Sequence, residues 1–131
     1  MDYKVKVHWG DTDAAGIVFY PNYYKWMDEA THEIFSSIGH PTDTLFKENI
    51  VLPLIETHCN FKQPVLYNTE LIVRSKIEFL KEKVFKLSHH FYCEGQLVAE
   101  GYEVRAWAST AEERTKAVAI PEHVKKRLLE E

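Results

Sequence analysis

Several features that would assign a chain to a specialised class are missing from this sequence. Only two cysteines occur in 131 residues, Cys59 and Cys93. They form no CxxC motif and lie in predicted strands, where a free cysteine usually behaves as a small buried hydrophobe. No apolar run approaches membrane-spanning length, and the N-terminal segment lacks the apolar core of a signal peptide. We therefore expect a reduced, cytoplasmic protein with no membrane insertion.

An excess of positive charge and the common catalytic motifs are also missing. The formal net charge is −4, so nucleic-acid binding has no electrostatic support, and any anion site must be a local basic patch. There is no Gly-x-Ser-x-Gly elbow and no glycine-rich phosphate loop. The seven histidines form no ligand set, since His89 and His90 are adjacent in a predicted strand and point to opposite faces. The sequence thus indicates neither a metal nor a redox cofactor.

What the chain does contain is an ordinary globular composition rich in aromatic residues. Hydrophobic residues make up 45% of it, with seven phenylalanines, seven tyrosines and three tryptophans. The length suits one domain with a substantial core and is too short for two. We therefore expect a single domain over residues 1–131.

The apolar periodicity changes once near the N-terminus. Alternation over Tyr3–Trp9 predicts a half-buried strand, with Trp9 on its apolar face. From Asn22 the apolar residues recur at three- and four-residue steps through Ile38, which predicts a helix of about four turns. Gly39 and the proline after it end that helix.

The remainder of the chain alternates as strands. Strands are predicted at residues 51–61, 70–80, 84–92 and 97–108, followed by a short helix over 121–131 with Val124 and Leu128 facing inward. Short polar breaks between them are typical of an antiparallel meander. The fold expected is α+β, an antiparallel sheet of about five strands wrapped around one long central helix. One helix is short for such a sheet, so oligomerisation through an edge or the open face is expected.

Two aspartates, Asp11 and Asp13, precede the long helix and admit three interpretations. From spacing alone, the favoured one is that a carboxylate caps or stabilises the helix N-terminus. A hard metal site is a weaker alternative, because the loop offers too few oxygen ligands. The third interpretation is catalytic. The free N–H groups of the helix start near Tyr20 would face the aspartate loop, which places a site for a developing oxyanion beside a carboxylate.

Basic residues gather in two places outside that loop. Lys81 and Lys83 lie in the break between two predicted strands, and Arg114 lies near the C-terminal end. Solvated surface side chains explain most such groupings. If the groups converge, they could hold a phosphorylated ligand.

The segment GDTDAAGIVFYPNY, residues 10–23, closely resembles the signature of the 4-hydroxybenzoyl-CoA thioesterase family of hotdog-fold enzymes. The likeness covers the whole chain, and Arg114 followed by Ala-Ile-Pro-Glu at residues 119–122 resembles the closing segment of that family. The resemblance implies an acyl-CoA thioesterase with sites at subunit interfaces, assembled as a homotetramer. The partner it implies is an acyl-CoA or aryl-CoA substrate.

The same resemblance implies roles for individual residues. Asp13 matches the catalytic carboxylate, Tyr20 matches the residue whose backbone N–H holds the thioester carbonyl, and Asp28 matches a position that helps shape the acyl pocket. Lys81, Lys83 and Arg114 are the candidates for binding the phosphates of CoA. The aromatic residues around the helix, among them Tyr23 and Trp26, fit a flat pocket.

Three functions remain open at this stage. The first is an aryl-CoA thioesterase of the hydroxybenzoyl type, favoured because the histidine usual in Tol-Pal-associated relatives after the tyrosine is missing here. The second is a short- or medium-chain acyl-CoA thioesterase of the Tol-Pal-associated type, and the third is a non-catalytic hotdog protein that binds CoA esters. For an enzyme we expect Asp13 to act as nucleophile, because a carboxylate with an ordinary pKa of about 4 is a weak general base.

Overall fold

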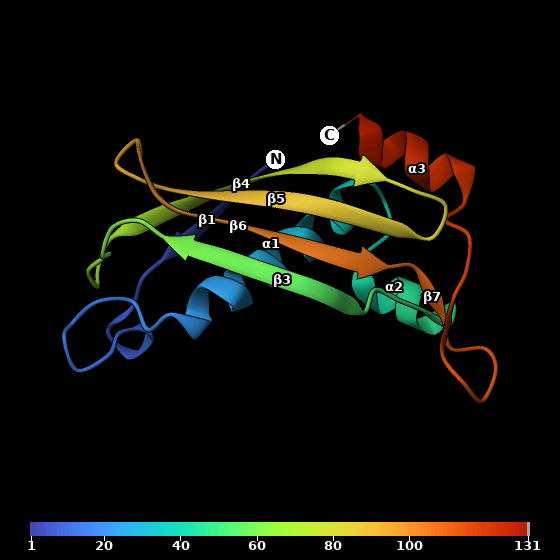
Figure 1. Cartoon of the computed structure of the whole chain (residues 1–131), viewed down its shortest axis with the longest axis horizontal. Helices are drawn as coiled ribbons and strands as arrows, with labels where there is room; N and C mark the ends of the chain where they lie inside the picture. The colour runs from blue at the N-terminus through green and yellow to red at the C-terminus, as the bar shows by residue number, and fades with distance from the viewer. Residues whose placement is uncertain (131) are drawn as a thin grey trace.

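The computed structural model describes residues 1–130 and has the expected α+β architecture (Figure 1). Its elements in chain order are β1 (Asp2–Lys6), the 3₁₀ turn η1 (Trp9–Asp11), α1 (Pro21–Ser37), α2 (Thr42–Lys47), β2 (Ile50–Val51), β3 (Leu54–Phe61), β4 (Glu70–Leu80), β5 (Val84–Cys93), β6 (Gln96–Ala106), β7 (Ala108–Ser109), β8 (Lys116–Ala117) and α3 (Glu122–Leu129). The final residue of the predicted C-terminal helix, Glu131, lies outside the described residues. No helix in the described part of the chain is both long enough and apolar enough to cross a bilayer.

The main sheet has five antiparallel strands in the order β1-β4-β5-β6-β3, and it curves around α1 (Figure 1). This arrangement confirms the predicted hotdog fold. The predicted limits of β4 match the structure, and those of β5 and β6 differ from it by one or two residues. Strands β1 and β3 are the sheet edges. A second, three-stranded sheet of short strands has the order β2-β7-β8.

Helix α1 is buried along most of its length because its apolar residues recur at helical spacing. Its buried residues are Tyr23, Trp26, Met27, Ala30, Thr31, Ile34 and Phe35. Pro21 occupies the first turn, where the missing N–H breaks no helical hydrogen bond. Gly39 has a φ of 88°, a left-handed conformation that glycine adopts without steric cost, so the helix ends as predicted.

The core between helix and sheet consists of two apolar clusters. The first surrounds the N-terminal half of α1 and contains Tyr23, Trp26 and Met27 with residues of β1, β4 and β5. The second surrounds the C-terminal end of α1 and also contains α3, where Val124 and Leu128 are buried as predicted. Among the described residues, six polar or charged ones are also buried, namely Thr31, Ser75, Ser88, His89, Glu103 and Arg105.

Three sequence predictions differ from the structure in detail. The first strand ends at Lys6, and Trp9 is 68% exposed in η1 instead of lying on the apolar face, because the chain turns away from the sheet there. The polar connection after α1 contains a short helix, α2, which buries only Leu45 and so carries almost no apolar periodicity. The strand predicted at 51–61 is interrupted at Pro53, leaving β2 and β3 in different sheets.

Candidate active site

The loop between η1 and α1 is built around its two aspartates, which make different contacts. The Asp11 carboxylate accepts a hydrogen bond from the His8 backbone N–H at 2.9 Å and so caps η1. Asp13 begins a tight turn in which its Oδ1 accepts from the Ala15 N–H at 2.8 Å and its carbonyl accepts from the Gly16 N–H at 2.9 Å. Gly16 has a φ of 76°, which this turn requires.

Neither aspartate caps the long helix. Helix α1 begins after Tyr20 with no side-chain cap and no acidic residue in its first turn. The interpretation of Asp11 or Asp13 as a hydrogen-bonded cap of α1 is therefore wrong. Of the residues described, no three His, Cys, Asp or Glu side chains are grouped as metal ligands, either in this loop or elsewhere.

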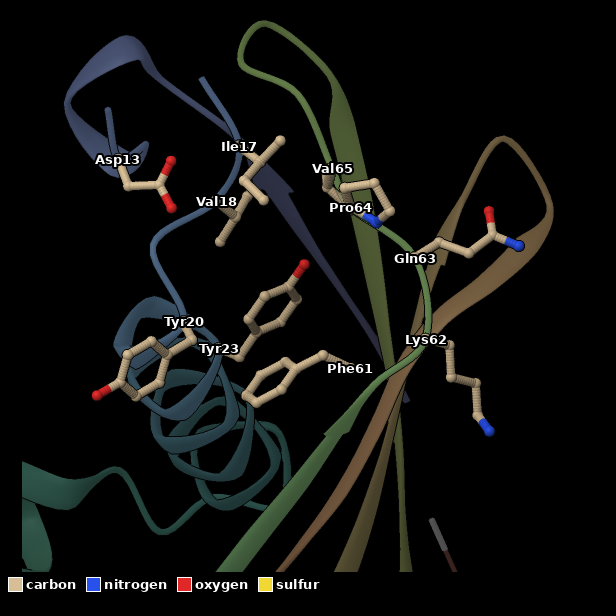
Figure 2. A pocket seen from close by; sticks show the side chains of 10 residues that line it. All are labelled: Asp13, Ile17, Val18, Tyr20, Tyr23, Phe61, Lys62, Gln63, Pro64 and Val65. Atoms are coloured by element: carbon tan, nitrogen blue, oxygen red, sulfur yellow. The ribbon is translucent and has the colours of Figure 1, made fainter. Parts of the chain in front are cut away.

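A cavity of about 370 Å³ opens beside the aspartate loop (Figure 2). Its walls come from the loop, from the start of α1 and from the segment that follows β3. The lining residues are Asp13, Ile17, Val18, Tyr20, Tyr23, Phe61, Lys62, Gln63, Pro64 and Val65. The walls are mostly apolar and aromatic, which is typical of a small-molecule site with few polar groups.

Backbone hydrogen bonds hold the walls of the cavity together. The Val18 N–H donates to the Val65 carbonyl at 2.8 Å, and Ile17 forms a bridge with Leu66. On the helix side, the Asp11 carbonyl accepts from the Phe19 N–H at 2.9 Å and from the Asn22 side-chain amide at 2.8 Å. The aspartate loop is thereby fixed both to the start of α1 and to the segment after β3.

A carboxylate and a helix N-terminus share this cavity. Figure 2 shows the Asp13 carboxylate turned toward Ile17 and Val18, on the cavity side of the loop. Within residues 1–130, no hydrogen-bond donor reaches its Oδ2, and no acceptor takes the backbone N–H of Tyr20. The amide at a helix start carries partial positive charge, so an oxygen bearing developing negative charge would be stabilised there.

The two aromatic residues expected at the acyl pocket differ in position. Tyr23 lines the cavity and contacts the Phe61 ring with the centroids 5.2 Å apart, and burial raises the pKa of its hydroxyl to about 12. Trp26 is buried behind it, edge-on to the Tyr23 ring at 5.7 Å, and does not line the cavity. The Tyr20 ring is 59% exposed and turns away from Tyr23 (Figure 2).

Asp28 is not a lining residue of this cavity and is ion-paired further along α1. Its Oδ1 accepts from Arg105 Nη2 at 2.7 Å and lies 3.1 Å from His32 Nε2. The hydrogen bond from His32, assisted by Arg105 and opposed by burial, lowers the pKa of Asp28 to about 2. Asp28 is thus an ionised and anchored carboxylate.

The three basic residues proposed for CoA are exposed and lie far from the cavity in the same chain. Lys81 and Lys83 are in the hairpin between β4 and β5, and Arg114 is in the loop between β7 and β8. Both segments lie at the right end of the molecule in Figure 1, whereas the aspartate loop and the end of β3 lie at the left. A CoA molecule bound at the cavity would meet these residues only on another copy of the chain.

The wall formed by residues 61–65 was not predicted from the sequence. Phe61 is the last residue of β3, and Pro64 follows three residues later, where a strand cannot continue. The side chains of Lys62 and Gln63 extend away from Asp13 in Figure 2, so the apolar members Phe61, Pro64 and Val65 face the opening. A proline soon after a predicted strand is the one signal in the sequence that marks this segment as a turn.

Comparison with known proteins agrees with this geometry. The family described as the thioesterase-like superfamily matches residues 7–128. The 4-hydroxybenzoyl-CoA thioesterase of Pseudomonas sp. (strain CBS-3) is 30% identical over 124 residues, which is 88% of each chain. A 1,4-dihydroxy-2-naphthoyl-CoA hydrolase of Prochlorococcus marinus (strain MIT 9313) is 29% identical and covers 90% of this chain and 82% of its own. The solved structure of a gentisyl-coenzyme A thioesterase is 44% identical, covers 98% of both chains and superposes with a TM-score of 0.87.

Proposed function

This chain belongs to the thioesterase-like superfamily, and from that premise we propose that it hydrolyses an aryl-CoA thioester to the aromatic acid and CoA, with Asp13 as the catalytic carboxylate. It is a thioester hydrolase of the hotdog fold. The observation that supports the catalytic assignment is that Asp13 and Tyr20 line the same cavity, and that within residues 1–130 neither Asp13 Oδ2 nor the Tyr20 backbone N–H has a hydrogen-bond partner.

The reaction needs an attacking oxygen and a polarised carbonyl. The Tyr20 N–H would donate a hydrogen bond to the carbonyl oxygen of the thioester and stabilise the charge that develops on it. Asp13 Oδ2 would attack the carbonyl carbon, the carbon–sulfur bond would break, and the CoA thiolate would leave and take a proton from water. Water would then hydrolyse the aspartyl anhydride, releasing the aromatic acid and restoring the carboxylate.

Nucleophilic attack suits Asp13 for a structural reason. One of its oxygens is engaged by the turn and the other has no donor among the described residues, so the side chain is oriented while a lone pair stays available. This arrangement suits a nucleophile better than a general base.

The proposed substrate class is a hydroxylated aromatic acyl group. The three relatives above are named for hydroxybenzoyl, dihydroxynaphthoyl and gentisyl thioesters, all of which are hydroxyaryl groups. The Tyr23 and Phe61 rings would pack against a flat acyl group, with Trp26 supporting Tyr23 from behind. Asp28 would serve as a polar contact for the far side of the acyl group.

The site is proposed to be shared between subunits of a homotetramer. Strand β3 is an unpaired sheet edge with Leu54, Ile55 and Phe61 exposed, an edge suited to pairing with another copy. Lys81, Lys83 and Arg114 would then bind the CoA phosphates from a neighbouring subunit. Both cysteines are free thiols, which supports the reduced cytoplasm as the place of action.

A mixing experiment tests the shared site. Asp13→Asn and the triple variant Lys81→Ala/Lys83→Ala/Arg114→Ala are each expected to have low activity alone. Hybrids formed by unfolding and refolding the two together should regain part of the wild-type rate, since some sites then combine an intact Asp13 with intact cations. No gain above the sum of the separate variants would contradict sharing.

The function itself is tested by following thiol release from benzoyl, hydroxybenzoyl, hexanoyl and palmitoyl CoA thioesters. The proposal predicts the highest kcat/KM for hydroxybenzoyl-CoA. A preference for hexanoyl-CoA would favour the short- or medium-chain alternative, which the aliphatic walls at Ile17, Val18 and Val65 would also accommodate. Binding without thiol release from any thioester would contradict hydrolysis.

A further inference from the structure

The side chain of Tyr23 is almost entirely buried, yet its hydroxyl forms no hydrogen bond in the described part of the chain. Tyr23 is 4% exposed, and its Oη has no partner within residues 1–130. Ser88 Oγ is the one fully enclosed side-chain oxygen or nitrogen that lacks a partner among those residues. Because Tyr23 Oη also lacks a partner and is not enclosed in that way, it reaches open space, and the open space beside Tyr23 is the cavity.

This hydroxyl extends back to the level of the helix start. Tyr23 follows Tyr20 by three residues, which is about 4.5 Å along the axis at 1.5 Å per residue. Side chains on a helix lean toward its N-terminus, so a long side chain in the first turn extends back past that turn. Figure 2 shows the Tyr23 hydroxyl directed into the space bounded by Val18 and Pro64, which both line the cavity. The hydroxyl therefore enters the cavity that Tyr20 also lines.

Three aromatic side chains hold the ring of Tyr23 in place. The ring centroid of Phe91 on β5 lies 5.1 Å away, that of Phe61 at the end of β3 lies 5.2 Å away, and that of Trp26 on α1 lies 5.7 Å away. These contacts come from three different elements, so they fix the direction of the hydroxyl before a substrate binds. A donor that is oriented in advance can stabilise developing negative charge without reorganisation.

Packing does not explain why this residue carries a hydroxyl. A phenylalanine would make the same three ring contacts, and a polar group without a partner in a buried side chain costs stability. Burial raises the pKa of the Tyr23 hydroxyl to about 12, with smaller contributions from Cys59 and Cys93. The hydroxyl is therefore neutral at neutral pH and keeps its proton available for a hydrogen bond.

The other polar side chains that line the cavity do not offer a donor to it. Lys62 and Gln63 extend away from the aspartate loop, and the ring of Tyr20 turns away from Tyr23 (Figure 2). The remaining lining residues are apolar apart from Asp13, which as a carboxylate can only accept. Among the lining side chains, Tyr23 is thus the donor directed into the cavity.

A thioester carbonyl oxygen has two lone pairs, and the Tyr20 N–H can satisfy one of them. We propose that the Tyr23 hydroxyl is a second hydrogen-bond donor to this oxygen and stabilises the oxyanion that forms as Asp13 attacks. This inference rests on the proposed thioester hydrolysis. Tyr23 is then a catalytic residue that contacts the reacting carbonyl and transfers no proton. Its effect does not depend on which acyl group the thioester carries.

The first test is Tyr23→Phe, which removes the hydroxyl and keeps the ring. The rate of thiol release in a single turnover of benzoyl-CoA, with enzyme in excess, should fall about 100-fold, the scale seen when one oxyanion donor is removed. KM in steady state should change by less than about threefold, because the interaction strengthens only as charge develops on the oxygen. A Tyr23→Phe enzyme with the wild-type rate would refute the second donor and leave the thioesterase proposal standing.

The matched control removes the same atom from the next residue. Tyr24 is half-buried beside the first apolar cluster and does not line the cavity, so Tyr24→Phe should keep the wild-type rate. An equal loss of rate in Tyr24→Phe would assign the effect to packing of the first turn and contradict the proposal.

Thermal unfolding separates catalysis from a structural role of the hydroxyl. Tyr23→Phe should melt at or above the wild-type temperature, since the ring contacts remain and a hydroxyl without a partner is removed. A clearly lower melting temperature would show that the Tyr23 hydroxyl is bonded within the protein, which contradicts a donor reserved for the substrate.

A comparison of substrates distinguishes the carbonyl from the acyl ring as the group that Tyr23 contacts. Every thioester has the carbonyl, so Tyr23→Phe should lose the same factor in rate on benzoyl-CoA and on 4-hydroxybenzoyl-CoA. A loss confined to the hydroxylated substrate would mean that Tyr23 contacts the ring hydroxyl, and the proposal would be wrong. If wild type releases no thiol from either thioester, the proposed function itself fails.

A vibrational measurement observes the carbonyl directly. The Asp13→Asn enzyme is expected to bind benzoyl-CoA without turning it over, and hydrogen bonds to the carbonyl oxygen lower its stretching frequency. Adding Tyr23→Phe to this enzyme should raise the frequency, whereas adding Tyr24→Phe should leave it unchanged. An unchanged frequency in the Asp13→Asn/Tyr23→Phe enzyme would show that the hydroxyl does not reach the carbonyl oxygen.

Discussion

Two carboxylates near the N-terminal half of α1 occupy opposite kinds of environment. Asp13 lies in an exposed loop, accepts one local hydrogen bond and borders the cavity at the helix start. Asp28 is held by Arg105 and His32, and behind Arg105 stand the fully buried Glu103 and His89. The Asp13 carboxylate is oriented by one hydrogen bond and keeps an oxygen free to react, whereas the Asp28 carboxylate is oriented by ion pairs.

The contrast shows how a small domain can assign different roles to the same functional group. A reacting oxygen needs an unoccupied lone pair and a route to the substrate, so the surrounding structure must orient it with few contacts. A carboxylate that only recognises a substrate can be anchored by strong ion pairs, because it must keep its charge and direction. The expected consequences of altering each carboxylate therefore differ in kind.

The largest expected effect is on turnover. Asp13→Asn should lower kcat for hydroxybenzoyl-CoA at least about 1,000-fold, because the amide is nearly isosteric but cannot attack the thioester, and loss of a principal catalytic group has effects on this scale. The melting temperature should change by no more than a few degrees, since the asparagine Oδ1 can still accept the exposed hydrogen bond from the Ala15 N–H. Thiol release and thermal unfolding measure the two.

The control for Asp13→Asn is the same substitution at Asp11, in the same loop. Asp11→Asn alters the carboxylate that caps η1, and its effect on kcat should be far smaller. Comparable losses in both variants would mean that the loop conformation matters and the Asp13 carboxylate does not. A fully active Asp13→Asn enzyme would leave Asp13 as a turn residue only.

At the paired carboxylate the largest effect should be on stability. Arg105→Met leaves Glu103 buried without its guanidinium partner, and breaking a buried pair in this way costs about 3–5 kcal/mol. Urea unfolding should show this loss as a lower midpoint with an unchanged slope. A change below about 1 kcal/mol would mean that water or His89 replaces Arg105 at little cost.

The buried pairing of Glu103 with His89 and Arg105 should also make stability depend on pH in acid. Burial alone would raise the pKa of Glu103, but hydrogen bonds from His89 and Arg105 outweigh it and lower the pKa to about 2, against an ordinary 4.5. A carboxylate with a depressed pKa stabilises the fold above its unfolded pKa and loses that contribution as the pH falls toward the folded value. About 3 kcal/mol of the unfolding free energy should therefore disappear between pH 5 and pH 2.

Glu103→Gln tests whether the loss of stability in acid comes from protonation of Glu103. It cannot titrate, so its unfolding free energy should fall less steeply than that of wild type over the same pH range. Equal slopes in wild type and Glu103→Gln would assign the acid sensitivity to other groups.

The smallest effect in this series concerns substrate choice. Asp28→Ala should change the ratio of hydroxybenzoyl to benzoyl turnover by about tenfold, the scale of one charge-assisted hydrogen bond, while kcat for benzoyl-CoA stays within a few fold. Steady-state kinetics on the two thioesters measure it. An unchanged substrate profile would remove Asp28 from the acyl pocket.

The fold could be predicted largely because its main elements are strongly periodic. Strand β4 alternates between more and less buried positions from Glu70 to Glu78, and α1 carries a regular apolar stripe, so the sequence predicts the position of both correctly. Helix α2 was missed because it buries only Leu45, and Trp9 was assigned to the wrong environment because the end of β1 depends on where the chain leaves the sheet. Local patterns do not contain that information.

The site could be predicted only in part for a related reason. The position of Asp13 beside the helix start follows from the local order of loop and helix, and the candidate roles of Tyr20 and Asp28 follow from the family resemblance. The wall at residues 61–65 and the partners Arg105 and Glu103 come from segments more than 30 residues further along the chain. Polar residues at inward positions of β5 and β6 were the available signal, since His89 on β5 and Glu103 and Arg105 on β6 occupy such positions.

The most direct test of the account is a single turnover in ¹⁸O-labelled water, with enzyme in excess over hydroxybenzoyl-CoA and mass analysis of the peptide that contains Asp13. An attack by the Asp13 carboxylate on the thioester predicts ¹⁸O in that side chain after the anhydride is hydrolysed. Label found solely in the released aromatic acid, with an unlabelled peptide, would contradict nucleophilic attack by Asp13.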